Sequence, residues 1–133
     1  MVSLQEVDDM SFPPMPDEVR QKVIRRGCDA ASPSNKYQLH HAIVSRKMVQ
    51  GMGKESQALI HDERNLLVLP AEWNTSHANI PSTLEAIRML HKHYRLRDIE
   101  EFYDSIPFKK KPFKFPKMKD LYPRTEIAEY LNS

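Results

Sequence analysis

The sequence predicts a small α+β fold built on one β-hairpin, with helices before and after it in the chain. Apolar and polar residues alternate over 37–44, and a second, short apolar run covers 66–69. Apolar residues also recur at helical spacing over 17–27 and over 82–95. The length of 133 residues and the apolar fraction of 40% are typical of one domain with one core.

The first helix is expected to begin at Asp17, a suitable N-cap, and to end near Gly27. Val19 and Val23 would lie on its apolar face. The preceding residues, 1–16, hold three prolines among acidic and small residues, and this composition predicts an extended arm.

The hairpin is expected to consist of a strand over 37–44, a long functional loop over 46–64 and a second strand over 66–69. The loop contains two glycines and no sustained hydrophobic period. Pro70 suits the first position of a helix, which is expected to continue to Ala78.

Two further helices are expected in the second half of the chain. Ser82 and Glu85 have the spacing of a capping box, which predicts a helix that continues to about Arg95. A shorter helix would follow and end before Pro107.

The segment from Phe108 to Lys119 contains six lysines, no acidic residue, and interleaved phenylalanines and prolines. It is expected to be an extended basic segment, followed by a last helix over 125–131. The predicted organisation is therefore an N-terminal arm over 1–16, a domain over 17–106, and a basic C-terminal extension over 107–133.

Composition narrows the class of protein. The 20 Lys and Arg against 18 Asp and Glu leave a net charge of +2, so affinity for a polyanion would depend on where the charges lie. No apolar run approaches the roughly 18 to 20 residues that cross a bilayer, and the N-terminus does not resemble a signal peptide. Cys28 is the only cysteine, so neither an internal disulfide nor a cysteine-rich zinc site is expected. We expect a soluble cytoplasmic protein with no membrane partner.

The residues that suggest chemistry surround the hairpin. His40 and His41 are adjacent in the first strand, Asn65 follows His41 by 24 residues, and Asn74 follows Asn65 by nine. A hairpin and a following helix can bring such residues to one metal ion. His77 lies three residues after Asn74, on the same face of the expected helix, and is a further candidate ligand.

Other titratable side chains receive less weight. Asp62 and Glu72 are alternative metal ligands of lower rank. Three more histidines, His61, His91 and His93, are expected to be structural or exposed.

The run Leu39-His40-His41-Ala42-Ile43-Val44-Ser45-Arg46, the later Asn65-Leu66-Leu67-Val68-Leu69, and Asn74 together resemble the HNH endonuclease family. The site of that family is a ββα-metal unit, also called a His-Me finger. The resemblance covers roughly residues 19 to 80 and extends to small HNH proteins encoded by phages.

The resemblance implies a divalent-metal-dependent DNA endonuclease or nickase that leaves a 5'-phosphate. It makes His41 the general base, a role that suits an imidazole with an unperturbed pKa of about 6.5. Asn65 would hold the loop that orients His41, while His40 and Asn74 would be metal ligands.

The sequence departs from the family pattern in two places. Asn74 stands where the family usually has its final histidine, and this H-N-N variant favours Mg²⁺ or Mn²⁺, with Zn²⁺ or Ni²⁺ as alternatives. Only Cys28 remains of the four cysteines that often form a structural zinc knuckle. No structural zinc is therefore expected, and Trp73 would pack apolar bulk in its place.

DNA is the expected partner. The candidate contacts to it are the basic side chains around the loop and in the C-terminal segment, namely Arg46, Lys47, Lys109, Lys110, Lys111 and Lys114. One alternative is a non-catalytic nucleic-acid-binding or protein-interaction module. Another is an accessory factor that binds a protein partner through the C-terminal extension. The sequence leaves open the target specificity, the number of strands cut and the oligomeric state.

Overall fold

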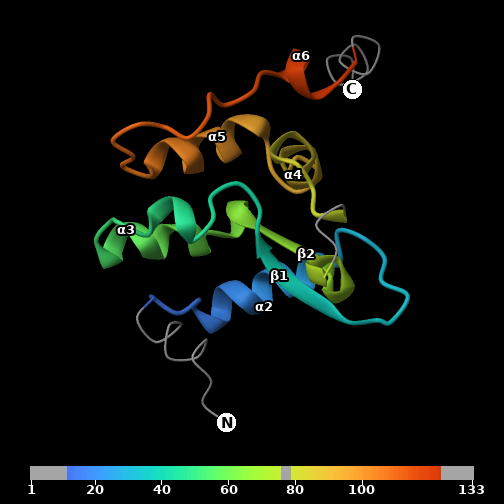
Figure 1. Cartoon of the computed structure of the whole chain (residues 1–133). Helices are drawn as coiled ribbons and strands as arrows, with labels where there is room; N and C mark the ends of the chain where they lie inside the picture. Colours follow the sequence, from blue (N-terminus) through green and yellow to red (C-terminus); the bar gives the residue numbers. More distant parts are fainter. Residues whose placement is uncertain (1–11, 76–78, 124–133) are drawn as a thin grey trace.

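The computed structural model describes residues 12–75 and 79–123 of the chain. Figure 1 shows a β-hairpin in the middle of the molecule, with α2 on one side of it and the pair α4 and α5 on the other. The helices are α2 (Asp17–Arg26), α3 (Lys54–Ala58), α4 (Thr83–Leu90), α5 (Leu96–Ser105) and α6 (Met118–Leu121). The structure confirms a small α+β fold.

The hairpin pairs β1 (Tyr37–His41) with β2 (Leu66–Pro70) in antiparallel register, from Tyr37 opposite Pro70 to His41 opposite Leu66. The first strand is shorter than predicted and ends at His41. It ends there because the amides of Ile43 and Val44 donate to the side-chain Oδ1 of Asn65 instead of to a backbone carbonyl of a partner strand.

The two faces of the hairpin pack into different clusters. Leu66 and Val68 pack against Val23 of α2 in a small cluster. Leu67 and Leu69 belong to the main core, whose other buried members include Ile87 and Leu90 of α4 and Ile99 and Phe102 of α5. Because side chains alternate along a strand, each side chain of β1 points to one of these two faces.

Helix α2 forms nearly where it is predicted. Asp17 was predicted to be the N-cap. The N-cap is instead Pro16, and Asp17 is the first helical residue. Its carboxylate still lies in the first turn, where the helix dipole favours negative charge. Gly27 ends the helix with a φ of 100°, a conformation that glycine adopts without steric cost.

The segment over 46–64 is not the open loop that was predicted. It folds into short helical turns: η1 (Lys47–Val49), α3, η2 (Leu59–His61) and η3 (Glu63–Asn65). Val49 and Ile60 are fully buried in the main core. Their burial stabilises these short turns, although the segment has no long hydrophobic period.

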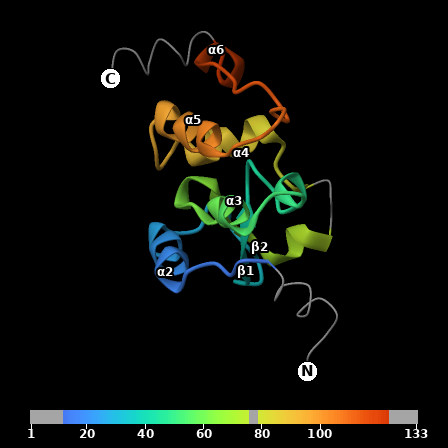
Figure 2. The same ribbon diagram turned by 90° about the vertical axis from the view of Figure 1, so that its left-hand side faces the viewer.

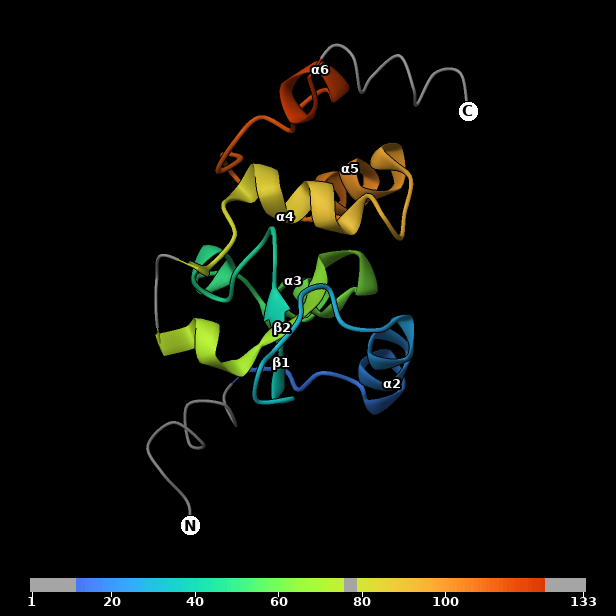
Figure 3. The ribbon, with the colours of Figure 1, turned by 90° about the vertical axis from the view of Figure 1, so that its right-hand side faces the viewer.

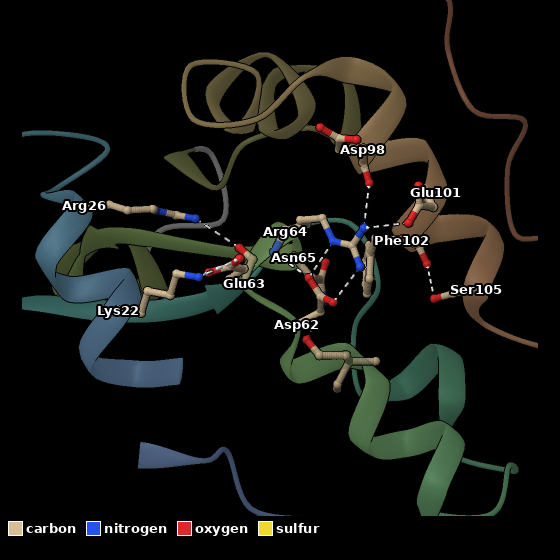
Figure 4. A network of polar contacts seen from close by, with 11 residues as sticks. Lys22, Arg26, Asp62, Glu63, Arg64, Asn65, Asp98, Glu101, Phe102 and Ser105 are labelled. Carbon is tan, nitrogen blue, oxygen red and sulfur yellow. Dashed lines mark hydrogen bonds and ion pairs between the residues drawn. The ribbon is translucent and has the colours of Figure 1, made fainter. Parts of the chain in front are cut away.

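The turn at Asp62–Asn65 connects the layers, as Figure 4 shows. Arg26 of α2 donates to the Glu63 carbonyl oxygen at 3.0 Å. Arg64 donates to Asp62 at 2.9 Å and to the carbonyl oxygen of Asp98 in α5 at 3.1 Å. This turn therefore fixes the position of the start of β2 relative to both sides of the molecule.

The chain after β2 differs from the predicted helix over 70–78. Pro70 is the last residue of β2, and a 3₁₀-helix, η4 (Ala71–Thr75), follows it. Helix α4 begins after Ser82, whose hydroxyl accepts from Glu85 N at 3.3 Å, as the capping box predicted. It ends at Leu90, before the expected end near Arg95.

The basic C-terminal segment packs on α5 instead of extending away from it (Figures 2 and 3). The Phe113 ring stacks on Tyr103 with ring centroids 4.5 Å apart, and the Tyr103 hydroxyl donates to the Phe113 carbonyl oxygen. Phe115 is buried in the main core. The helix expected over 125–131 lies outside the described residues.

Among the residues that the structure describes, none of the helices combines the length and the apolar character needed to cross a membrane.

Candidate active site

The side chain of Asn65 is completely buried and organises the loop that follows β1. Its Oδ1 accepts from the backbone N–H groups of Ile43 and Val44 at 2.8 and 2.9 Å. Its Nδ2 donates to the carbonyl oxygens of Val44 and Ile60, both at 2.9 Å. The amide thus uses both donors and both acceptor sites, and the contact with the loop after His41 is the one that the sequence analysis predicted.

His41 lies at the end of β1, directly before that loop, and it contacts a second histidine. Its Nε2 is 3.0 Å from Nδ1 of His61, and Nε2 of His61 is 2.6 Å from the carbonyl oxygen of Pro13. No spacing in the sequence signals a role for His61, because the contact forms only when the segment over 46–64 folds back on β1. Its side chain is buried, as a structural histidine would be.

The hydrogen bond to Pro13 decides the tautomers of both rings. A backbone carbonyl oxygen only accepts, so His61 donates from Nε2, and its Nδ1 in the neutral ring is an acceptor. His41 must then donate from Nε2. The lone pair on Nδ1 of His41 makes no hydrogen bond to the described residues, so this nitrogen can take up a proton.

The environment of His41 keeps its ring neutral. Burial, followed by the charges of His61, Arg46 and His40, lowers its pKa from 6.5 to about 4. Burial also lowers the pKa of His61, although the bond to Pro13 opposes the shift. At neutral pH both rings are therefore uncharged, and His41 is in the form that accepts a proton.

A hollow of about 570 Å³ lies beside His41 and His61. Two guanidinium groups, from Arg20 of α2 and from Arg46, line it. The Arg46 guanidinium lies over the Phe12 ring, 4.4 Å from its centroid. Guanidinium groups bind phosphate oxygens through paired N–H donors, so a hollow lined by two arginines is suited to an anionic ligand such as a phosphate group.

His40 points to the other face of the hairpin. It pairs with Leu67, a residue of the main core, whereas His41 pairs with Leu66 on the face toward α2. The Nε2 atom of His40 is buried and has no hydrogen-bond partner among the described residues. Burial alone lowers its pKa, so the ring is neutral. An unpaired buried nitrogen costs about 1 to 3 kcal/mol.

The remaining predicted ligands cannot be placed as side chains. The backbone of Asn74 lies in η4, but its side chain and all of His77 lie outside the described residues. Residues 71–75 form a 3₁₀-helix in place of the predicted α-helix, and the position of His77 relative to Asn74 stays a prediction.

The two lower-ranked acidic candidates are occupied by other contacts. Asp62 accepts from the backbone and guanidinium of Arg64, and although burial raises its pKa, these bonds outweigh it and lower the pKa. Glu72 accepts from the hydroxyls of Ser32 and Ser34 at 2.8 and 3.1 Å. The described residues include no group of three or more His, Cys, Asp or Glu placed to hold an ion.

The predicted DNA-contacting residues fall into two groups. Arg46 borders the hollow, and the nearby Lys47 is exposed in η1. The lysines of the C-terminal segment lie beyond α4 and α5, on the far side from α2 (Figures 1 and 3). Lys109, Lys110 and Lys114 are exposed, while Lys111 is paired with Asp104.

The residues at and beside the positions of the zinc-knuckle cysteines make other contacts. Cys28 is exposed, and the neighbouring Asp29 accepts from Val68 N at 2.7 Å and lies 2.6 Å from Nε2 of His93. Trp73 is partly buried and packs against the main core. These contacts join the end of α2, the middle of β2 and the turn after α4.

Comparisons with protein-family models, with curated proteins and with solved structures find no match for this chain, so its own geometry is the basis for assigning a function.

Proposed function

We propose that this protein is a divalent-metal-dependent DNA endonuclease or nickase of the HNH type, with His41 as the general base. The observation that carries the proposal is the chain of contacts from His41 through His61 to the Pro13 carbonyl, which assigns the proton of the neutral His41 ring to Nε2 and leaves Nδ1 as the basic nitrogen beside a hollow lined by two arginines. A phosphodiester hydrolase needs this combination, because it must deprotonate water beside an anionic substrate.

In the proposed reaction, Nδ1 of His41 takes a proton from a water molecule in the hollow. The water oxygen forms a bond to phosphorus, the bond between phosphorus and the 3'-oxygen breaks, and the departing 3'-oxygen takes a proton from solvent water, which leaves a 3'-hydroxyl and a 5'-phosphate. Arg20 and Arg46 balance the charge of the phosphate. Asn65 keeps the backbone after His41 in place, so that the ring does not need to reorient during the reaction.

The proposed metal ligands are His40 and Asn74, with His77 as a further candidate. Because His40 lies on the opposite face of β1 from His41, the ion would not lie inside the hollow. The buried, unpaired Nε2 of His40 supports this assignment. An amide oxygen in place of a histidine nitrogen shifts the preference toward harder ions such as Mg²⁺ or Mn²⁺, and an ion held there would supply positive charge to the leaving 3'-oxygen.

A second candidate function is a nucleic-acid-binding module without turnover. Its support is the same pair of guanidinium groups beside the hollow, together with a described structure that lacks a cluster of three ionisable ligands. Such a module would bind the sugar-phosphate backbone but would not cleave it. The C-terminal lysines would serve either function, or would bind an acidic protein partner.

Incubation of supercoiled plasmid with the protein and Mg²⁺, Mn²⁺, Ni²⁺ or Zn²⁺ distinguishes the two functions. The nuclease proposal expects relaxed or linear product with at least one of the ions, loss of that product in His41→Ala, and its retention in His91→Ala. His91 is a matched control because it contacts Tyr122, away from the hollow. DNA binding without cleavage under all four ions would favour the module.

A further inference from the structure

We infer that His61, together with the backbone carbonyl of Pro13, is a positioning unit that holds a proton on Nε2 of His41 and thereby assigns the base role to Nδ1. The physical claim concerns two hydrogen bonds and stands on the geometry alone. Its catalytic meaning rests on the proposed function.

The direction of the chain of hydrogen bonds follows from its last member. The Pro13 oxygen has no proton to give, so the 2.6 Å contact requires a proton on Nε2 of His61. The neutral His61 ring then presents a lone pair at Nδ1, and the 3.0 Å contact requires a proton on Nε2 of His41. Both imidazoles thus have one assigned tautomer.

The two rings are held at this distance by one buried side chain. Asn65 Nδ2 donates to the carbonyl oxygen of Ile60, the residue before His61. Asn65 Oδ1 accepts from Ile43 and Val44, the second and third residues after His41. The same amide therefore fixes the backbone next to both histidines, which explains how residues 20 apart can keep a hydrogen bond between rings.

Residues 12–15 complete the unit from the N-terminal side. Phe12 makes an edge contact with the His61 ring at 5.8 Å between centroids, and the Arg46 guanidinium covers the Phe12 ring. Pro13 and Pro14 restrict φ at two successive positions, which limits the rotation of the carbonyl that accepts from His61. A segment that the sequence predicts to be an arm thus contributes a group to the candidate site.

The unit lets His41 accept a proton without breaking a contact. When Nδ1 takes a proton, the ring becomes an imidazolium, and Nε2 still donates to His61. His61 itself gains and loses no proton in this step.

Two substitutions at His61 separate the two hydrogen bonds. In His61→Asn, Oδ1 lies as many bonds from the backbone as Nδ1 of histidine, so the acceptor for His41 is kept and the donor to Pro13 is lost. In His61→Gln, Nε2 takes the place of the ring Nε2, so the donor to Pro13 is kept and the acceptor for His41 is lost. Thermal unfolding of both variants checks that each one folds.

The test is ¹⁵N NMR of the metal-free, full-length protein at neutral pH. The inference expects a His41 ring protonated on Nε2, with scalar coupling across the bond to Nδ1 of His61 in the wild type. It expects the protected His41 Nε2–H signal to persist in His61→Asn and to be lost in His61→Gln. A wild-type His41 protonated on Nδ1, or a signal unchanged in both variants, would overturn it.

A cleavage assay on the same variants keeps the two proposals apart. If the NMR result is as expected and no ion supports cleavage by the wild type, the positioning unit stands and the nuclease proposal fails. If the wild type cleaves DNA, the inference expects kcat to fall at least about tenfold in His61→Gln and to recover in His61→Asn. Equal loss in both variants of a folded protein would show that His61 only supports the fold.

Discussion

At the residue scale, Asn65 controls more of the candidate site than any titratable group that surrounds it. Its four hydrogen bonds satisfy buried backbone groups of Ile43, Val44 and Ile60. Each buried backbone group that loses its partner costs about 1 to 3 kcal/mol. Removal of the Asn65 side chain would therefore destabilise the fold and disturb the candidate site at the same time.

Replacement of Asn65 by alanine is expected to lower the free energy of unfolding by about 3 kcal/mol or more, because several buried groups lose their partner at once. Urea unfolding followed by circular dichroism measures the change. Asn79→Ala, at an exposed asparagine, is the matched control and is expected to change stability by less than about 0.5 kcal/mol. A similar small change in Asn65→Ala would contradict the described hydrogen bonds.

The lowered pKa of His41 predicts acid sensitivity of the metal-free protein. The unfolded chain binds a proton near pH 6.5, whereas the folded protein binds it near pH 4, so acidification favours the unfolded state. The stabilisation is fully present above about pH 6.5 and is lost progressively as the pH falls toward 4. A difference of about 2.5 pH units corresponds to about 3 kcal/mol.

Chemical denaturation at a series of pH values in EDTA tests this expectation, with His41→Gln for comparison. The substituted protein should lose less stability than the wild type between pH 7 and pH 4. Parallel curves for the two proteins would show that His41 titrates near its ordinary pKa in the folded state.

At the element scale, the sequence determines the elements whose signals are local. The alternation over 37–44 and the apolar run over 66–69 predicted the hairpin, and the Ser82 capping box predicted the start of α4. The elements that differ from prediction depend on contacts distant in sequence. The segment over 46–64 folds into helical turns because Val49 and Ile60 reach the main core. No local period signals that burial.

The His41–His61 contact has the same cause. Its two members are separated by the whole of that segment, and His61 alone has no motif around it. Asn65, by contrast, was predicted to hold the loop because the family resemblance implies that role, and its amide can both donate and accept.

The C-terminal segment gives a prediction at this scale, because the Tyr103 hydroxyl bonds both the carbonyl oxygen and the N–H of Phe113. Tyr103→Phe is expected to lower stability by about 1 to 2 kcal/mol and to loosen the segment. Limited trypsin digestion should then cleave faster within 109–119. Tyr37→Phe removes a hydroxyl that contacts Ser32 N, far from this segment, and should leave the cleavage rate there unchanged.

At the scale of the whole molecule, the hollow beside His41 and the C-terminal lysine segment belong to different parts of the fold. The helices α4 and α5 lie between the hairpin and the lysine segment in all three ribbon views. A stretch of duplex held in the hollow therefore cannot rest flat on the lysines as well. The lysines would contact another part of a bent or long nucleic acid.

Substitution of Lys109, Lys110 and Lys114 by glutamine is expected to weaken DNA binding and to flatten its salt dependence. Each lost phosphate contact lowers the slope of log K against log salt by about 0.9, so the three together should lower it by about 2 to 3. Lys36→Gln, at an exposed lysine outside the segment, is the control for a single charge. An unchanged slope in the triple variant would indicate that the segment does not touch DNA.

The single-turnover rate of cleavage of an end-labelled DNA duplex, measured with and without added imidazole, tests the central claim most directly. With the ion that supports the fastest reaction, cleavage by His41→Ala should be slower than cleavage by the wild type by about 100-fold or more. Added imidazole should restore part of the rate, because it can occupy the space that the His41 side chain leaves beside the hollow. His91→Ala should react at the wild-type rate with or without imidazole. Wild-type cleavage by His41→Ala would contradict the assignment of His41 as the base.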